Sequence, residues 1–503
     1  MRIKIIFLMA FLILALVLLI SCGGASGPDD KNGAPTGDSK ENQNQDQNAD
    51  NARENTPDFL PDGLNFNGVS IRILHRDDTE IWRDEISVEE EIGEIVTDAL
   101  YRRNRKVEER LNIKITPVPI AGTWDSRDSF LRTVRNSVNA GADDYDLIAG
   151  YAYYITALAP EGMLFNLNDL EYLSPNADWW SADLAEQLNV GGKFYYITGD
   201  YALTFLQTMF VMFFNKTIAR DLSLPNLYQI VLDGGFTLDK MEELTKSVYR
   251  DLNGDGLRDA GDMYGLALTT GNFIDAMFNT FDLPIIKKDA DGVHRIVMNS
   301  PKMISAVERI YGYLYESGDV FSMDERDSDA GGGVIVNMFS ENKTLFMPGS
   351  LGSNEQLRAM DSDYGIIPYP KFDLSQAAYY TTSQDSYSLF CVPATCGQTP
   401  AAGAAIEALC AESYRTVTPA YYEIALKQKY SRDDETSQML DLIRAGATFD
   451  FGTVNSYSLD NINKIFRNLI SEKSKDFASR YERSERAWQR SLDKLLDAYQ
   501  DLP

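Results

Sequence analysis

A long polar segment divides this chain into parts that must behave differently. Residues 23–58 contain no Val, Ile, Leu, Met, Phe, Trp, Tyr or Cys. Burying so little apolar surface cannot offset the entropy lost on ordering, so we expect a flexible tether here. The hydrophobic core must therefore come from the residues after it. The whole chain has 503 residues, which at roughly 150 residues per domain allows two or three domains.

An apolar run precedes the tether. Arg2 and Lys4 are followed by apolar residues without a break from Ile5 to Ile20. As a helix this run is about 24 Å long, shorter than the roughly 30 Å hydrocarbon core of a bilayer. The pattern predicts an export signal over residues 1–21. An uncleaved signal anchor is the alternative.

The end of the apolar run carries a lipidation motif. Leu19-Ile20-Ser21-Cys22-Gly23 resembles the lipobox of bacterial lipoproteins. The resemblance implies cleavage before Cys22 and acylation of Cys22 with palmitate-type chains, which anchor the protein on the extracytoplasmic face of the cell membrane. Residues 22–59 would then be the lipidated Cys and a disordered tether. Two or three acyl chains hold a protein at a bilayer far more stably than one.

Charge and motif content exclude several functions. Asp and Glu number 75 against 47 Lys and Arg, a formal net charge of -28, which argues against a nucleic-acid partner. The sequence has only His75 and His294, and it contains no Gly-x-Ser-x-Gly elbow, phosphate-binding loop, dinucleotide fingerprint or His-Glu-x-x-His motif. We therefore expect no enzyme and no catalytic residues. A surface glycoside hydrolase stays open, because the spacing of a carboxylate pair cannot be read from sequence.

The body of the chain shows the alternation of an α/β fold. Residues 69–73 and 113–118 have strand patterns, and an apolar stripe predicts a helix over 89–111 between them. A strand, a helix and a strand within about fifty residues indicate a βαβ unit with a parallel or mixed sheet. Helical spacing returns at 238–250, and in the C-terminal third at 460–470 and 476–499.

Short segments spread along the body carry a family resemblance. They are Tyr145–Gly150, Glu161–Leu167, Met212–Lys216, Gly235–Met241, Tyr364–Pro370 and Tyr379–Thr381. In this order they resemble the extracellular solute-binding proteins, family 1, of bacterial ABC importers. The resemblance implies a periplasmic-binding-protein-like fold (type II), with two α/β lobes, a hinge and C-terminal helices. Lobe 1 is expected at 60–203 plus 384–429, and lobe 2 at 204–383 plus 430–503.

The same resemblance implies a function. The protein would be a monomeric, lipid-anchored receptor that closes by a hinge motion on a carbohydrate, in particular an oligosaccharide. It would then deliver this solute to the permease of an ABC transporter. A receptor for peptides or another polar solute, and a sugar sensor, are the alternatives.

Candidate ligand-binding residues follow from the chemistry of sugars. A sugar presents apolar C–H faces and a rim of hydroxyls, so its binder needs aromatic faces and paired hydrogen-bonding groups. In α/β lobes these groups belong on loops at the carboxyl ends of strands. Packing within the core is the ordinary alternative for each aromatic residue. The predicted ligand-binding residues are Arg76, Asp77, Asp78, Trp82, Trp124, Asp125, Tyr151, Tyr153, Tyr154, Trp179, Trp180, Asp200 and Tyr201 in lobe 1, and Asn272, Asp275, Ser350 and Asn354 in lobe 2.

One loop has the ligand spacing of a calcium site. Residues 251–262 place oxygen ligands at loop positions 1, 3, 5, 9 and 12, with Gly at position 6 and a backbone carbonyl at position 7. Asp at position 12 reaches one methylene less than the usual Glu, so a structural Ca²⁺ would bind weakly. A surface Asp-Gly turn is the alternative. The predicted metal ligands are Asp251, Asn253, Asp255, Leu257, Asp259 and Asp262.

The body contains three further cysteines, Cys391, Cys396 and Cys410. An odd number of cysteines in an exported protein leaves at least one thiol unpaired, and allows one disulfide among the three.

Overall fold

The computed structural model describes residues 53–324, 333–355, 357, 360–422 and 434–502. The predicted signal, Cys22 and most of the predicted tether lie outside these residues. Residues 50–503 form one compact unit, and the account below concerns this unit alone. None of its described helices combines the length and the apolar character that a membrane crossing requires.

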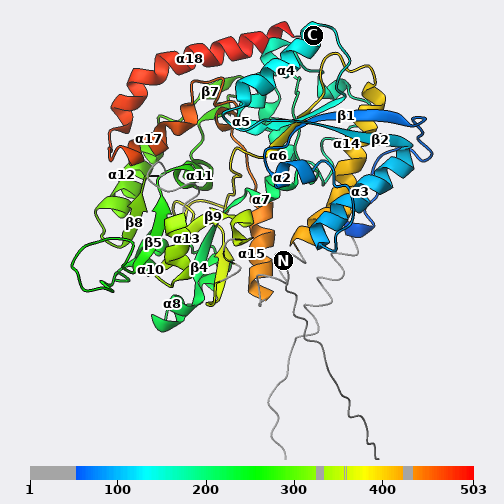
Figure 1. Cartoon of the computed structure of the whole chain (residues 1–503). Coiled ribbons are helices and arrows are strands. Elements are labelled where there is room, and N and C mark those ends of the chain that lie inside the picture. Colours follow the sequence, from blue (N-terminus) through cyan, green and yellow to red (C-terminus); the bar gives the residue numbers. More distant parts are fainter. Residues whose placement is uncertain (1–52, 325–332, 356, 358–359, 423–433, 503) are drawn as a thin grey trace, which may run out of the picture. The chain divides into compact units, whose positions relative to one another are not determined.

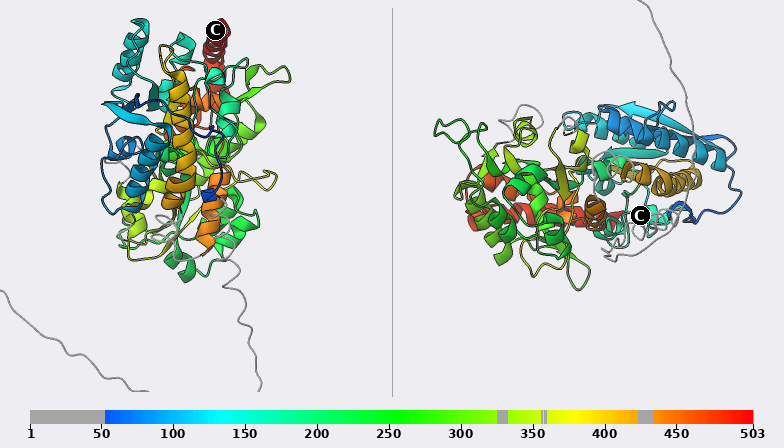
Figure 2. Two further views of the ribbon diagram at one scale, coloured as in Figure 1. Left: turned by 90° about the vertical axis from the view of Figure 1, so that its right-hand side faces the viewer. Right: turned by 90° about the horizontal axis from the view of Figure 1, so that it is seen from below.

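The first sheet has four strands in the order β11-β3-β1-β2. The strands β1 (Val69–Arg76), β2 (Ile113–Ile120) and β3 (Leu147–Tyr151) are parallel, and β11 (Ser388–Cys391) pairs with β3 in the antiparallel direction. The helix α14 (Thr399–Glu412) packs beside α3 (Ile95–Leu111), and both views in Figure 2 show this. The helix α4 (Arg127–Asn139) follows β2. The predicted βαβ unit is confirmed.

The helix of this unit begins later than its apolar stripe predicts. The helix α3 starts at Ile95 instead of Glu89. The Asp98 carboxylate accepts hydrogen bonds from the backbone N–H groups of Ile92 and Gly93, at 2.8 and 3.2 Å. Gly93 has φ of 82°, a left-handed conformation that L side chains rarely adopt. These bonds turn the chain just before the first helical residue.

The second sheet has five strands in the order β10-β4-β9-β5-β8. Every residue of β4 (Phe210–Asn215) and β5 (Tyr264–Thr269) is buried, which is typical of strands covered on both faces. The strand β5 runs parallel to β8 and β9, whereas β4 runs antiparallel to β9 and β10. The other bounds are β8 (Val320–Met323), β9 (Thr344–Ser350), β10 (Tyr364–Ile367), α8 (Lys216–Asp221), α9 (Leu227–Leu232), α10 (Leu238–Thr245), α11 (Asn272–Thr280), α12 (Pro301–Tyr315) and α13 (Gly333–Ser340).

Hydrogen-bonded segments connect the two sheets. The chain leaves the first sheet through α7 (Leu203–Gln207) and returns through residues 381–385, while 446–448 lie alongside. Phe210 N donates to Thr382 O and Gln384 N to Thr208 O, both at 2.9 Å, and Thr381 N donates to Gly446 O at 2.8 Å. This ladder is the hinge between the sheets. The exact lobe ranges stay predictions, because the boundary at 429/430 lies outside the described residues.

The C-terminal helices contact elements of both lobes. They are α15 (Asp434–Ala445), α16 (Phe451–Val454), α17 (Ile465–Ser471) and α18 (Phe477–Asp501). The helix α18, red in Figure 1, packs on α12 and α17 and also on the 3₁₀ turn η1 (Ala159–Glu161) of the first lobe. Near its end, Tyr499 is buried against Tyr195 with ring centroids 5.8 Å apart. The helix α18 therefore touches lobe 1 as well as lobe 2.

The described start of the chain is bound to lobe 1. Asp58, near the end of the predicted tether, accepts hydrogen bonds from Arg110 of α3 at 2.5 and 2.8 Å and from Arg415 at 2.7 Å. Burial alone would raise the pKa of Asp58, but the two guanidinium groups outweigh it and lower this pKa to about 2.

The three cysteines of the body are free thiols. Cys391 and Cys410 are buried, and Cys396 is partly exposed.

Candidate functional site

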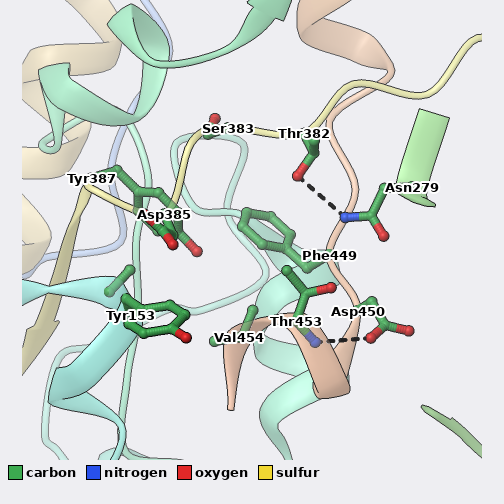
Figure 3. Close-up of a pocket in the computed structure, with 11 residues that line it drawn as sticks. Tyr153, Asn279, Thr382, Ser383, Asp385, Tyr387, Phe449, Asp450, Thr453 and Val454 are labelled. Carbon is green, nitrogen blue, oxygen red and sulfur yellow. Dashed lines mark hydrogen bonds between the residues drawn. The ribbon is translucent and has the colours of Figure 1, made fainter. Parts of the chain in front are cut away.

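A pocket lies where the two sheets and the hinge meet (Figure 3). A second pocket shares five of its residues, so the two form one space, which we call the site cleft. The first pocket is lined by Ala152, Tyr153, Asn279, Thr382, Ser383, Asp385, Tyr387, Phe449, Asp450, Thr453 and Val454. The second adds Phe210, Asn272, Asp275, Ala276, Phe278, Gln384 and Asn463.

Aromatic residues from the carboxyl ends of the first sheet's strands gather at the cleft. Tyr151 ends β3, and Tyr153 lies in the following turn α5 (Ala152–Ile155). The ring centroid of Tyr153 is 5.4 Å from that of Trp124, and the Tyr151 ring is 6.3 Å from Trp82. Parallel strands place their carboxyl ends at one sheet edge, which explains why residues distant in sequence meet here.

Arg76 supports this aromatic group from within the fold. Its Cζ lies 4.1 Å from the Trp82 ring centroid and 5.1 Å from that of Tyr151, within cation–π range. Its Nη2 donates to Ser386 O and Ser388 Oγ, both at 2.9 Å. Arg76 is 1% exposed, so it holds the aromatic rings in position and has no free surface for a solute.

Asp385 lines both pockets of the cleft. The Tyr151 hydroxyl donates to its Oδ1 at 3.2 Å. Burial raises the pKa of Asp385, while the positive charges of Lys464 and Arg467 oppose that shift. Burial and the nearby Asp385 charge also raise the pKa of Tyr151, so its hydroxyl remains a donor. Asp385 was not among the predicted residues, because it precedes a strand whose antiparallel pairing the sequence does not reveal.

Asp275 forms the opposite wall. It stands in the first turn of α11, and Arg467 of α17 donates to its two carboxylate oxygens, with Nε 3.0 Å from Oδ1. Burial raises the pKa of Asp275 to about 6, although the Arg467 charge opposes the shift. Asn272 lines the same pocket. The structure thus brings these two predicted lobe 2 residues to the cleft.

The C-terminal segment supplies cleft residues that the sequence interpretation missed. The ring of Tyr457 lies 6.1 Å from Tyr153, and the Tyr153 hydroxyl donates to Asn461 Oδ1. The helix predicted over 460–470 is wrong at its start, because Asp460 and Asn461 have φ of 54° and 58° and α17 begins at Ile465. Asn and Asp tolerate this left-handed conformation better than other side chains. In the sequence, the adjacent Asp460 and Asn461 were the available signal that the helix does not begin there.

Four predicted residues lie in a different place. Trp179, Trp180 and Asp200 line a separate pocket of about 190 Å³ together with Phe205 and Arg444. The Trp180 Nε1 donates to the buried Glu407 at 2.8 Å, and Asp200 pairs with Arg444 at 2.8 Å. Tyr201 is fully buried and stacks on Phe390, with centroids 4.5 Å apart. These four residues have structural partners and do not line the cleft.

Among the described residues, Tyr153, Asn272 and Asp275 are the predicted ligand-binding residues that line the two cleft pockets, and the others lie outside them. The exposed Asp78 accepts a hydrogen bond from Gly122 N at 2.6 Å, and Ser350 Oγ lies 3.0 Å from Ser353 Oγ. Tyr154 is buried, and its hydroxyl donates to Gly122 O at 2.7 Å. Asp77 and Asp125 are exposed. The side chain of Asn354 lies outside the described residues.

The 251–262 loop is closed by its own hydrogen bonds. Asp251 accepts bonds from the N–H groups of Gly254 and Gly256, at 2.7 and 3.0 Å. Asp262 is buried, and its two oxygens accept from Leu252 N at 3.2 Å and from the Tyr249 hydroxyl at 3.1 Å. Across the described ranges, no group of three or more His, Cys, Asp or Glu side chains is arranged to hold a metal ion. Calcium binding stays a prediction.

Comparisons with solved structures define the class of fold. The sheets, the hinge and the C-terminal helices form the two-lobed α/β fold of ABC solute-binding proteins, so the predicted fold class is confirmed. No protein-family model matches the sequence, and no curated protein matches it.

Three of the similar structures illustrate the likeness. M. tuberculosis UspC has a TM-score of 0.53 and 12% identity, over 86% of this chain and 100% of that one. A cyclo/maltodextrin-binding protein complexed with maltotetraose has a TM-score of 0.52 and 11% identity, over 86% and 96%. An ABC transporter solute-binding protein from Thermotoga lettingae, bound with α-D-tagatose, has a TM-score of 0.51 and 13% identity, over 86% and 100%.

Proposed function

We propose that this protein is an extracytoplasmic receptor that binds a carbohydrate in the site cleft. One observation carries the proposal. Aromatic rings and the buried carboxylate of Asp385 lie together between the two lobes, beside the hinge. Trp124 and Tyr153 suit the apolar face of a sugar, and Asp385 suits its hydroxyls. Two of the similar structures are complexes, one with maltotetraose and one with α-D-tagatose, which supports this solute class.

Binding, rather than turnover, is the function that the cleft residues support. Of its carboxylates, Asp275 is held by Arg467, and Asp450 accepts hydrogen bonds from the backbone N–H groups of Thr453, Ile285 and Ile286. The third cleft carboxylate, Asp385, accepts a hydrogen bond from the neutral hydroxyl of Tyr151. A carboxylate so placed can accept hydrogen bonds from two hydroxyl groups of a sugar.

Delivery would depend on closure. Contacts that exist only when both lobes hold the same solute stabilise the closed state, and this state would dock on an ABC transporter permease. An acylated Cys22 followed by the polar tether would keep the receptor at the membrane. A lipid on Cys22 is tested by mass spectrometry of the processed chain, with Cys22→Ser expected to abolish both the lipid and membrane retention.

A thermal-shift screen tests the binding function. The chain lacking residues 1–21 and carrying Cys22→Ser would be screened against mono- and oligosaccharides, then peptides. A solute that binds only the folded state stabilises it by about 2.7 kcal/mol at 100 times its Kd. A rise in Tm with intact sugar recovered supports the proposal. A rise only with peptides changes the solute class, and recovery of cleaved sugar indicates a glycosidase.

A pair of variants locates the site. Asp385→Asn keeps the side-chain shape but replaces one acceptor oxygen with a donor, so the affinity for the sugar should fall about ten-fold or more. Asp361→Asn, at an exposed position outside the cleft, is the matched control and should leave the Kd unchanged. Equal affinities in the two variants would place the site elsewhere.

A further inference from the structure

Three aromatic rings pack edge to face beside the site cleft, and Tyr153 among them lines it. They belong to Trp124, Tyr153 and Tyr457, and we call them the aromatic box. Their centroids lie 5.4 Å (Trp124–Tyr153), 6.3 Å (Trp124–Tyr457) and 6.1 Å (Tyr153–Tyr457) apart. The rings meet at 61°, 84° and 69°, so they contact one another edge to face and do not stack.

A positive charge of the chain itself lies against two rings of this box. The Lys464 Nζ lies 4.6 Å from the Tyr153 centroid and 5.4 Å from the Trp124 centroid. Both distances are within the roughly 6 Å range of a cation–π interaction, and aromatic cages of this kind recognise ammonium groups. The ring faces best suited to stack on a sugar are therefore already used.

The position of Lys464 follows from the loop that carries it. Asp460 and Asn461 are consecutive residues with positive φ, and Asn461 accepts the hydrogen bond from Tyr153. Lys464 is then the N-cap residue of α17, whose Arg467 binds Asp275. One short segment thus joins both walls of the cleft and places the ammonium group between the rings.

The space that is left is too small for a sugar. The two cleft pockets have open volumes of about 20 and 30 Å³. On this measure a single water needs about 10–15 Å³, so each pocket has room for one or two waters. A saccharide can enter only after cleft side chains move.

Lys464 also neutralises part of the charge in the cleft. Its charge opposes the burial-driven rise of the Asp385 pKa more than any other neighbour, and it acts in the same direction on Asp275. When the ammonium group leaves the box, Asp385 loses a compensating charge. The pKa of Asp385 then rises further, unless hydroxyl donors of the solute replace the ammonium group.

We propose that Lys464 is an internal occupant of the aromatic box, which a solute must displace before it can stack on Trp124 and Tyr153. Lys464 thereby lowers the affinity for any solute that stacks on these rings. When no solute is bound, Lys464 covers the ring faces itself. The identity of the displacing solute rests on the proposed function. Occupation of the box by Lys464 does not, and it can be tested separately.

The first test uses a cation in place of a sugar. Lys464→Met removes the charge and keeps most of the side-chain length, and tetramethylammonium chloride is the probe. Binding of tetramethylammonium is followed by tryptophan fluorescence. The contribution of Trp124 is the part of this signal that is lost in Trp124→Phe. Lys464→Met should show a saturable change that the unmodified protein lacks. Identical responses of the two proteins would overturn the proposal.

Two further variants control for folding and for general charge effects. Lys473→Met removes an exposed lysine whose Nζ lies 5.3 Å from the Tyr315 ring centroid, outside the cleft, and should behave as the unmodified protein. Lys464→Gln is the second variant at the box, used if urea unfolding shows that Lys464→Met is unstable. A response in Lys473→Met equal to that in Lys464→Met would also count against the proposal.

The second test uses the saccharide found by the thermal-shift screen. Removing a competing cation–π interaction should tighten its binding about two- to five-fold in Lys464→Met. Weaker binding in this variant would make Lys464 a direct donor to the solute and overturn the proposal. If no saccharide binds any variant while tetramethylammonium still distinguishes Lys464→Met, the proposed function fails and the box occupancy stands.

Discussion

Asp275 and Arg467, 192 positions apart, form a two-point ion pair beside the site cleft, with Nε 3.0 Å from Oδ1 and Nη2 bonded to Oδ2. Each side chain is 17% exposed. The pair joins α11 of lobe 2 to the C-terminal segment that carries Lys464. The carboxylate and the guanidinium neutralise each other, so neither charge is left uncompensated in the cleft.

Breaking this pair should destabilise the fold. Arg467→Met leaves the largely buried Asp275 carboxylate without its partner, so the free energy of unfolding should fall by about 2–3 kcal/mol. Urea unfolding at pH 7 measures the loss. The double variant Asp275→Asn/Arg467→Met should recover part of it, because no charge then remains unpaired. Additive losses would show that the two side chains act independently.

Stability should depend on pH through Asp450. Burial raises the pKa of Asp450 to about 6, in spite of the N–H groups of Thr453 and Ile285 that bind its carboxylate. The folded state then holds more protons than the unfolded state between pH 4 and 6, so stability falls as pH rises through this window. Ionisation of Asp450 in this window lowers the free energy of unfolding by about 2–3 kcal/mol.

Asp450→Asn should remove this contribution, because an amide does not titrate. Urea unfolding at pH 4.5, 5.5 and 7 compares the slopes, with the exposed Asp361→Asn as the control. Asp275, whose pKa burial raises to about 6, will keep a slope of the same sign in both variants. An unchanged slope in Asp450→Asn would contradict the assignment.

The opposite pH dependence is expected of Asp58. Arg110 and Arg415 outweigh burial and lower its pKa to about 2, so the carboxylate stabilises the fold above pH 4. This stabilisation is lost as pH falls from 4 towards 2. Asp58→Asn should cost about 2 kcal/mol at pH 7 and progressively less as the pH falls towards 2, where the Asp58 carboxylate is about half protonated. Asp62→Asn, at an exposed neighbouring position, should cost nothing measurable.

Calcium, if it binds the 251–262 loop, must compete with existing hydrogen bonds. Asp262 already accepts from Leu252 N and the Tyr249 hydroxyl, and Asp251 from Gly254 N and Gly256 N. We expect no rise in Tm at 0.1 mM Ca²⁺ and a rise only at millimolar concentration, in the range of weak extracellular sites. Asp255→Asn should abolish that rise. A shift at micromolar Ca²⁺ would show a much stronger site.

Local sequence patterns were enough to predict much of the fold. The alternation over residues 69–73 and the apolar stripe before Leu111 report which side chains are buried, and burial follows the period of the local element. Chain topology then places strand ends at one edge, which is why Trp124, Tyr151 and Tyr153 could be assigned to a common site. Helix starts were less predictable, because a cap such as Asp98 acts through hydrogen bonds to turn residues.

The other half of the cleft could not be read in this way. Asp385, Tyr457 and Lys464 reach the cleft through contacts with residues more than two hundred positions away, and no local period encodes such a meeting. Trp180 is the opposite case, because a distant contact keeps it away from the cleft. Its sequence context suggested a binding residue, but Glu407 of α14 accepts its N–H group and holds it in the interior.

The sequence by itself determined the negative charge, the polar segment before the body, the α/β class and the aromatic half of the site, because each depends on composition or on a short period. Only the tertiary structure decided which carboxylates face the cleft and that Lys464 lies among the rings. These outcomes depend on the balance of burial, charge and space between segments distant in the chain, and such a balance exists only once the chain is folded.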